Sequence, residues 1–334
     1  MKGAAKDGVS APPAVPAWAD GIVGNGNVAE FLERAVRTDR LAHAYLFVGP
    51  DRVGKATVAR RFAASLLGVA DPGLHPDFCA VGREADPKTG KKHAGIVLDQ
   101  VHALTGRLSL GAMMNGWKAC ILDGADLLNK ESANALLKTL EEPHPKTVLL
   151  LVADGEERVM ATIRSRCQII RFVRVPSAEI AAALVSRGTG PADAELFARL
   201  AGGRPGAAFA YADDPSVLEG MFALREAILA LPSSAVADRF AAIERAVPSK
   251  IPFQEAVDRS REWLDLASEL LRDAMLLRLG SGERIVHVDR REQLEAWARS
   301  MDPAAVLACI GQSRRLVDAN VSPRAALERV SLAF

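Results

Sequence analysis

The sequence is poor in cysteine and in aromatic residues, and neither charge is in clear surplus. Its 334 residues contain 4 cysteines, 5% aromatic residues, and 42 basic against 41 acidic side chains. The cysteines are scattered without a CxxC pair, which excludes a disulfide framework and a zinc site built from paired cysteines. The net charge of +1 excludes a protein that coats DNA through bulk positive charge, but it is compatible with a local basic patch.

Long apolar runs are missing too. No run reaches the ~20 residues that a membrane helix needs, so we expect no membrane partner. The N-terminal segment has no continuous apolar stretch of the kind found in secretory signals. Its richness in Ala, Pro and Gly predicts a mobile tail over residues 1–20. These absences together predict a cytoplasmic protein whose cysteines stay reduced and buried.

Short apolar runs alternate with helical patterns across residues 21–175, as in a parallel α/β sheet flanked by helices. A continuous apolar run such as residues 44–48 is typical of a strand buried on both faces. Asn129 is expected to begin a helix that Pro143 ends. The strand candidates are residues 44–48, 96–98, 119–122, 148–152 and 169–170.

The pattern is helical after residue 175, apart from a weak strand candidate at 284–288. A small cluster interrupted by glycines covers residues 176–213, and a longer helical block covers residues 214–334. The length agrees with this division, because one domain usually takes about 100–200 residues. The sequence therefore predicts three domains of unequal size.

Residues 49–55 match the first seven positions of the phosphate-binding motif G-x-x-x-x-G-K-[ST]. They follow a predicted strand and open a predicted helix, where backbone N–H groups and the helix N-terminus favour phosphate. Gly49, Gly54 and Lys55 are therefore candidate nucleotide-binding residues. The eighth position is Ala56, which lacks the hydroxyl that would hold Mg²⁺.

Asp123 follows the strand candidate at 119–122, where an ATPase presents a metal-binding Asp and then a water-activating Glu. Gly124 occupies the Glu position. Because phosphoryl transfer depends on positioning and charge stabilisation, we expect this chain to hydrolyse ATP very slowly. Two interpretations stay open: an inherited strand–turn–helix junction, or a degenerate site that binds ATP or ADP weakly without hydrolysis.

Three further motifs follow one another in order. They are H-A-Y-L-F at residues 43–47, N-A-L-L-K-T-L-E-E-P at residues 134–143 and T-I-R-S-R-C at residues 162–167. Together with the phosphate loop they resemble bacterial clamp-loader subunits of the AAA+ family, and within it the delta-prime family of DNA polymerase III subunits. The resemblance covers about residues 22–212, whereas the C-terminal block shares only its length and helical character.

This resemblance implies an AAA+ nucleotide-binding-like domain over residues 21–175, a helical lid over 176–213 and a collar over 214–334 that joins a five-subunit ring. The implied partners are gamma/tau ATPase subunits and delta within the ring, and the sliding clamp and primer–template DNA through the complex. The implied role is a non-hydrolysing stator of the DNA polymerase III holoenzyme in DNA replication, which requires no cofactor of its own.

The resemblance also implies that Arg166 is an arginine finger, which acts in trans on ATP held by the adjacent subunit. A guanidinium suits this role because it offers a planar fork of donors to developing phosphate charge. Ser165 and Cys167 are expected to shape and pack the turn that carries it. A structural ion pair is the alternative role for Arg166, and Arg164 and Arg171 are competing candidates for the finger.

Three departures from the family pattern are informative. Residues 74–95 hold only Cys79 where the delta-prime family often carries a four-cysteine zinc module, so we expect no zinc. The lid has Gly206 where clamp-loader ATPases place an Arg that touches nucleotide. Asp154 stands near the end of the strand candidate at 148–152, where its carboxylate would repel phosphate.

Two other functions compete with this interpretation. A self-sufficient gamma/tau-like clamp-loader ATPase needs Ser or Thr at position 56 and Glu at position 124, and the sequence has neither. A sequence-specific DNA binder is disfavoured by the charge balance and by the lack of a recognisable DNA-reading motif. The basic loop over residues 83–93 is either a solvated insertion or a contact to DNA phosphates, and the sequence leaves both open.

Overall fold

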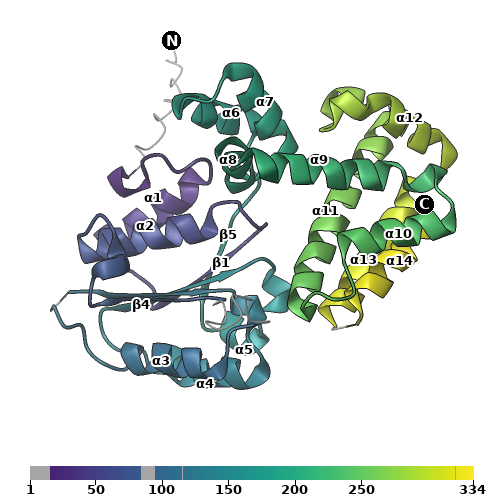
Figure 1. Cartoon of the computed structure of the whole chain (residues 1–334). Helices are drawn as coiled ribbons and strands as arrows, with labels where there is room; N and C mark the ends of the chain where they lie inside the picture. Colours follow the sequence, from purple (N-terminus) through teal and green to yellow (C-terminus); the bar gives the residue numbers. More distant parts are fainter. Residues whose placement is uncertain (1–15, 84–94, 115, 320) are drawn as a thin grey trace, which may run out of the picture. The chain divides into compact units, whose positions relative to one another are not determined.

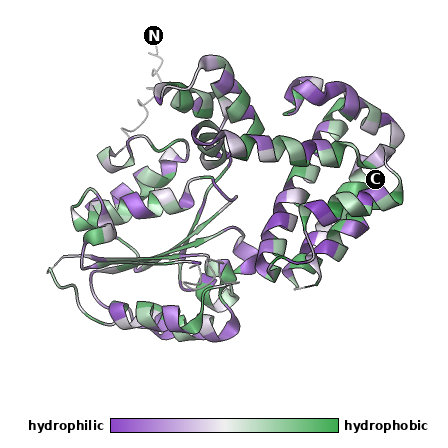
Figure 2. Cartoon of the chain, viewed as in Figure 1, coloured by the Kyte–Doolittle hydropathy of each residue, from purple (hydrophilic) through white to green (hydrophobic). Residues whose placement is uncertain are grey.

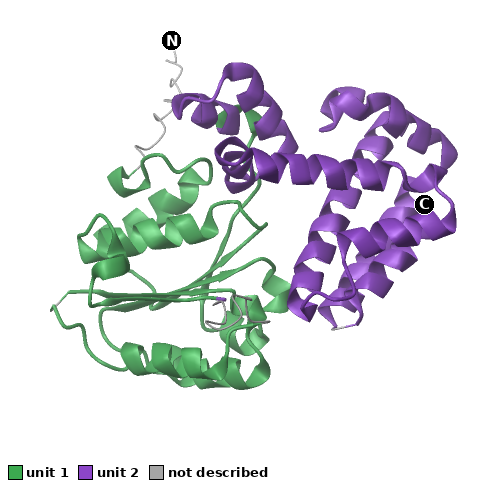
Figure 3. Cartoon of the chain, in the orientation of Figure 1, with its two compact units in different colours: residues 1–82, 95–179 green, residues 83–94, 180–334 purple. Residues whose placement is uncertain are grey.

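The computed structural model describes residues 16–83, 95–114, 116–319 and 321–334. The chain divides into two compact units (Figure 3). The first comprises residues 1–82 and 95–179, and the second comprises residues 83–94 and 180–334. The predicted lid and collar both fall almost entirely within the second unit, and the border between them stays a prediction.

A five-stranded parallel sheet forms the centre of the first unit, with the strand order β2-β3-β4-β1-β5 (Figure 1). Strands β1, β3 and β4 are buried along nearly their whole length, which explains their continuous apolar sequences. The predicted parallel α/β sheet is confirmed, with four of its five strand candidates. The strands are β1(Ala44–Val48), β2(Phe78–Val81), β3(Lys118–Asp123), β4(Thr147–Ala153) and β5(Gln168–Arg171).

Helices cover both faces of this sheet (Figure 1). On one face, Leu32 of α1 and Phe62 of α2 pack with Phe47 of β1. On the other face, Leu104 of α3 and Leu136 of α4 belong to a second cluster. Two cores form because successive side chains of a strand point to opposite faces. The helices are α1(Gly26–Arg37), α2(Lys55–Leu67), α3(Leu98–Leu108), α4(Lys130–Glu141) and α5(Ala161–Arg164).

One predicted strand of the first unit is wrong. Within residues 96–98, Ile96 makes only an isolated bridge, and α3 already begins at Leu98. Gln100 fixes this helix start, because its side chain accepts a hydrogen bond of 3.0 Å from the Val97 N–H. The remaining strand is β2, which lies at the sheet edge and buries only its first two side chains.

Both ends of α4 follow signals in the sequence. The Oδ1 atom of Asn129 accepts a hydrogen bond of 2.8 Å from the Ser132 N–H, so the predicted cap is confirmed. The helix ends at Glu141, two positions before Pro143. Two carboxylates, those of Glu141 and Glu142, therefore stand at the C-terminal end of this helix.

The helices that follow β5 mix hydrophobic and hydrophilic residues along their length (Figure 2). In the second unit, helices α9–α14 share one core that includes Trp263, Leu270, Leu294, Trp297 and Leu327. The helices are α6(Ser177–Ser186), α7(Pro191–Leu200), α8(Pro205–Asp213), α9(Pro215–Leu229), α10(Val236–Ala246), α11(Phe253–Arg278), α12(Arg291–Ser300), α13(Pro303–Asp318) and α14(Pro323–Ser331).

The weak strand candidate at 284–288 is also wrong. The 3-10 turns η6(Gly282–Arg284) and η7(Val288–Arg290) lie at its two ends. Between them, the buried carboxylate of Asp273 accepts hydrogen bonds from the N–H groups of Val286 (2.9 Å) and His287 (2.8 Å). These backbone donors are therefore turned toward α11 and are not available to a neighbouring strand. Across the described ranges, no helix has the length and apolar character to cross a bilayer.

Candidate functional site

The phosphate loop connects the C-terminal end of β1 to the start of α2. Gly49 lies so close to the segment after β5 that a Cβ atom there would come within 2.5 Å of the Phe172 carbonyl oxygen. Gly54 has a φ of +105°, in the left-handed region that favours glycine, and it caps α2. Both glycines are therefore required by the shape of the loop itself.

Lys55 turns back into this loop, and only 4% of its side chain is exposed. Its Nζ donates to the carbonyl oxygens of Gly49 and Pro50, both at 2.7 Å, and to Oδ1 of Asp154 at 2.9 Å. An ammonium group has three N–H donors, so these contacts use all of them. A phosphate can reach Nζ only if one of the three contacts opens.

Three carboxylates lie near this edge of the sheet: Asp123 ends β3, Asp126 lies in η3(Ala125–Leu127), and Asp154 follows β4. Lost hydration and the neighbouring charge of Asp154 raise the pKa of Asp123. Burial and Asp154 likewise raise the pKa of Asp126, although Arg158 at 3.6 Å opposes them. These carboxylates already repel one another, and a phosphate would add further negative charge.

The position of the missing water-activating Glu is set by the backbone. Gly124 has a φ of +103°, and a Cβ atom there would lie 3.0 Å from Cδ1 of Leu127. A residue with a side chain adopts this left-handed conformation at a cost of about 1–2 kcal/mol. The turn after β3 therefore favours Gly at this position, and a Glu there would carry that strain.

Arg166 lies between α5 and β5, at the opposite edge of the sheet from Lys55. The two strands β1 and β5 pair in parallel, so the residues after β1 and the residues before β5 stand at opposite edges. The 4 residues of β5 span about 13 Å at ~3.3 Å per residue. Arg166 therefore does not serve the phosphate loop of its own chain.

The Arg166 guanidinium is held by three contacts. Its Nη2 donates to Oε1 of Glu141 at 2.6 Å, and its Nη1 donates to the Thr162 carbonyl at 2.9 Å and to Oγ of Ser165 at 3.2 Å. About a third of the side chain, 34%, is still exposed. The structural ion pair considered as the alternative role is thus present, and the group remains accessible from outside.

The two competing arginines have different surroundings. Arg171 pairs with Glu156 through Nη2 and Oε2 at 2.7 Å, and both residues lie near the far end of β5. Arg164 has its Nε atom buried without a hydrogen-bond partner in the part of the chain that the structure describes. Arg171 is also exposed and ion-paired, so the feature that distinguishes Arg166 from it is its position at the N-terminal end of β5.

The neighbours of Arg166 in the S-R-C motif support the turn. The Oγ atom of Ser165 donates to the Thr162 carbonyl at 3.1 Å, which closes the end of α5. Burial raises the pKa of the Cys167 thiol to about 12, so this thiol is neutral and packs against the core cluster of α3 and α4.

The cysteines and the basic loop are the remaining features that the sequence analysis considered. Within the described ranges, no group of three or more His, Cys, Asp or Glu side chains is arranged to hold a metal ion. Cys79 of β2 lies beside Cys120 of β3, and both are buried. Arg83, at the start of the predicted basic loop, donates to Asp258 at 3.1 Å, and residues 84–93 lie outside the described residues.

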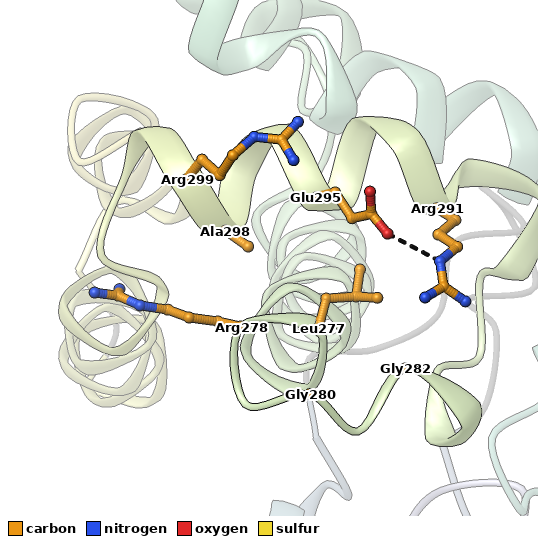
Figure 4. A pocket seen from close by; sticks show the side chains of 8 residues that line it. All are labelled: Leu277, Arg278, Gly280, Gly282, Arg291, Glu295, Ala298 and Arg299. Carbon is orange, nitrogen blue, oxygen red and sulfur yellow. Dashed lines mark hydrogen bonds and ion pairs between the residues drawn. The ribbon is translucent and has the colours of Figure 1, made fainter.

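A separate cavity of about 380 Å³ lies in the second unit, between the end of α11 and α12 (Figure 4). No sequence pattern had indicated this cavity. Arg291 in its wall donates to Glu295 at 2.9 Å, and the guanidinium groups of Arg278 and Arg299 point in different directions. The lining residues are Leu277, Arg278, Gly280, Gly282, Arg291, Glu295, Ala298 and Arg299.

Glu141 and the two loop carbonyls that hold Lys55 were not identified from the sequence. Glu141 stands inside the quoted motif at residues 134–143, but nothing in that motif indicates its partner 25 positions away. The Nζ atom of Lys55 donates to the backbone carbonyls of Gly49 and Pro50, and any residue type offers such a carbonyl, so the sequence pattern cannot indicate these contacts.

The parallel sheet and the G-x-x-x-x-G-K loop define a P-loop-type α/β module, in which Lys55 is hydrogen-bonded within its own phosphate loop. Residues 24–176 match the family model described as DNA polymerase III, delta subunit. Subunit delta' of DNA polymerase III from Pseudomonas aeruginosa is 36% identical over 184 residues, which are 49% of this chain and 54% of that protein. Through this segment the chain is similar to DNA polymerase III delta-prime subunits.

One further relative aligns over most of the chain, and another is a different subunit of DNA polymerase III. Subunit delta' from Bacillus subtilis is 25% identical over 323 residues, 91% of this chain and 94% of that protein. Subunit tau from Bacillus subtilis is 29% identical over 166 residues, 48% of this chain and 30% of that protein. The alignment with the Pseudomonas relative spans about half of that protein, 54%.

Solved structures of similar fold include a DNA polymerase III gamma subunit-related protein from Thermotoga maritima. It has a TM-score of 0.47 and 19% identity, and the match covers 90% of this chain and 97% of that chain. A superposition this loose carries no functional argument.

Proposed function

We propose that this chain is the delta-prime subunit of a DNA polymerase III clamp loader, which does not hydrolyse ATP and supplies Arg166 in trans to ATP bound by a neighbouring subunit. One observation carries the proposal: Arg166 is anchored and exposed at the edge of the sheet opposite its own phosphate loop. A phosphate that this guanidinium contacts must therefore belong to another molecule.

The chain's own loop supports the non-hydrolysing part of the proposal. All three donors of Lys55 are used inside the chain, position 56 offers no hydroxyl, and position 124 offers no carboxylate. The loop requires no cofactor for its shape, because Lys55 and Asp154 neutralise each other in it. ATP or ADP binds weakly at most, since it must displace these contacts.

The trans role fits the chemistry of phosphoryl transfer. An arginine finger stabilises negative charge that develops on the transferring phosphoryl group, and it can do so from a neighbouring chain. In this proposal, gamma/tau subunits hold the ATP, and delta completes a five-subunit ring. In this ring the chain acts in the cytoplasm during loading of the sliding clamp onto primer–template DNA.

A self-sufficient gamma/tau-like ATPase is the second candidate, because subunit tau is among the relatives. Its site would need Lys55 free for phosphate and a Glu in the turn at Gly124. The hydrogen bonds of Lys55 and the positive φ of Gly124 both disfavour that function.

The test is ATP hydrolysis by a ring reconstituted from this chain and the gamma/tau and delta subunits of the same organism, with clamp and primed DNA added. Arg166→Ala is expected to lower the stimulated rate at least tenfold, since a finger contributes about 10³-fold or more at the site it serves. Arg171→Ala is the matched control, because it removes an exposed, ion-paired arginine of the same unit.

Full activity of the Arg166→Ala ring contradicts the finger assignment. Turnover by the isolated chain that disappears in Lys55→Ala would instead favour the ATPase.

A further inference from the structure

We propose that Glu141 is a positioning residue for Arg166, which aligns the guanidinium before a neighbour's phosphate arrives. The proposal rests on the trans role of Arg166 and adds a residue of this chain to that role. Glu141 itself touches no phosphate in this scheme. It acts only through its ion pair with Arg166, in which Nη2 and Oε1 are 2.6 Å apart.

The geometry leaves part of the guanidinium available. Arginine has five N–H donors in a fixed planar arrangement. The contacts with Glu141, Thr162 and Ser165 account for three donor–acceptor pairs, which leaves two N–H groups for an incoming ligand. Glu141 therefore fixes the plane of the group without exhausting its donors.

The location of Glu141 is not explained by the stability of its own helix. It is the last residue of α4, and Glu142 follows it directly. The C-terminal end of a helix carries partial negative charge, so two carboxylates there are electrostatically unfavourable. The positive charge of Arg166 offsets the electrostatic cost at Glu141. Glu142 takes no part in this ion pair.

Exposure points away from a role in folding. The side chain of Glu141 is 51% exposed and that of Arg166 is 34% exposed. Ion pairs this accessible to water contribute little to stability. A free arginine side chain, however, samples many rotamers, and ordering it costs conformational entropy. If the ion pair already holds the side chain in one orientation, this entropy is not lost in the reacting step. Alignment is thus the effect that this pair can produce.

The experiment measures kcat and KM for ATP in the reconstituted ring with Glu141→Ala, Glu141→Gln, Arg166→Ala and the double variant Glu141→Ala/Arg166→Ala. Glu142→Ala is the matched control. We expect Glu141→Ala to lower kcat about tenfold with KM unchanged, because misplacing a reacting group mainly affects the reacting step. Glu141→Gln keeps an acceptor for Nη2 and is expected to retain most of the rate.

The double variant decides whether Glu141 acts through Arg166. We expect it to be no slower than Arg166→Ala alone, with unfolding midpoints equal to that of the unmodified chain. If Arg166→Ala leaves the rate unchanged, the trans role itself fails. The positioning role of Glu141 is overturned if Arg166→Ala lowers the rate but Glu141→Ala leaves the rate unchanged or raises it. It is also overturned if the double variant loses the product of the two single fold-changes.

Discussion

Lys55 should behave as a structural residue and not as a ligand for phosphate. Replacing it with Met removes three hydrogen bonds from a buried ammonium group and leaves the Asp154 carboxylate without its partner. Hydrogen bonds to a charged group are worth about 1.5–3 kcal/mol. Because Asp154 is 44% exposed, water replaces part of that contact, and we expect the first unit to lose about 2 kcal/mol of unfolding free energy.

The measurement must follow the first unit by itself, since two units need not unfold together. Hydrogen exchange of peptides from β1 and β4 at increasing urea concentration meets this need. With a slope of about 2 kcal/mol per M, Lys55→Met should lower the unfolding midpoint by about 1 M. Lys138→Met, which changes an exposed lysine of α4, should stay within about 0.5 kcal/mol of the unmodified chain.

A double-mutant cycle with Asp154→Asn sharpens the test. We expect a coupling free energy of about 1 kcal/mol between positions 55 and 154. The reasoning is refuted if Lys55→Met leaves the midpoint unchanged while ATP strongly stabilises the unmodified chain. A ligand that binds only the folded state raises stability by RT ln(1 + [L]/Kd), so a lysine reserved for phosphate would give that result.

Three other substitutions test separate parts of the first unit. Gly124→Glu should destabilise it by about 1–2 kcal/mol without restoring ATP hydrolysis, because the cost lies in the positive φ, and Gly124→Ala should cost a similar amount in urea unfolding. Asp126→Asn should raise the urea midpoint at pH 7, because burial raises the folded pKa of Asp126 and stability falls as pH rises through that pKa. The gain should shrink as the pH falls below the ordinary pKa of 3.8, where the carboxyl group is protonated in both states. Asn129→Ala should cost about 1 kcal/mol through loss of the α4 cap, and an unchanged midpoint would contradict the cap's contribution.

The parts of the fold that were predicted correctly are those set by local sequence. Strands β1, β3 and β4 are buried on both faces, so their apolar runs identify them without knowledge of their neighbours. The cap at Asn129 is likewise a contact across three residues. By contrast, β2 was missed although its four residues are all apolar, because a run this short, with only its first two side chains buried, did not stand out as a strand.

The errors arose where a distant contact decides the structure. Residues 96–98 are apolar and suit either a strand or the start of a helix. The choice depends on Gln100, whose Nε2 donates to the Gly82 carbonyl 18 positions earlier. At the site, the motif residues lie in the loop after β1 and in the turn before β5. Their partners were not predicted, because the acceptors of Lys55 are backbone atoms and a carboxylate 99 positions away.

The separation of Lys55 and Arg166 by the sheet has a consequence for how such a chain can change over time. The contacts at one edge share no residue with those at the other, so substitutions at the two edges should have independent effects. Such a chain can therefore lose ATP hydrolysis at its own phosphate loop and still supply the arginine that the proposed function assigns to a neighbour's site. In the proposed ring, loss of hydrolysis in one subunit would leave the neighbour's ATP site intact, because the contacts that hold Arg166 share no residue with the phosphate loop.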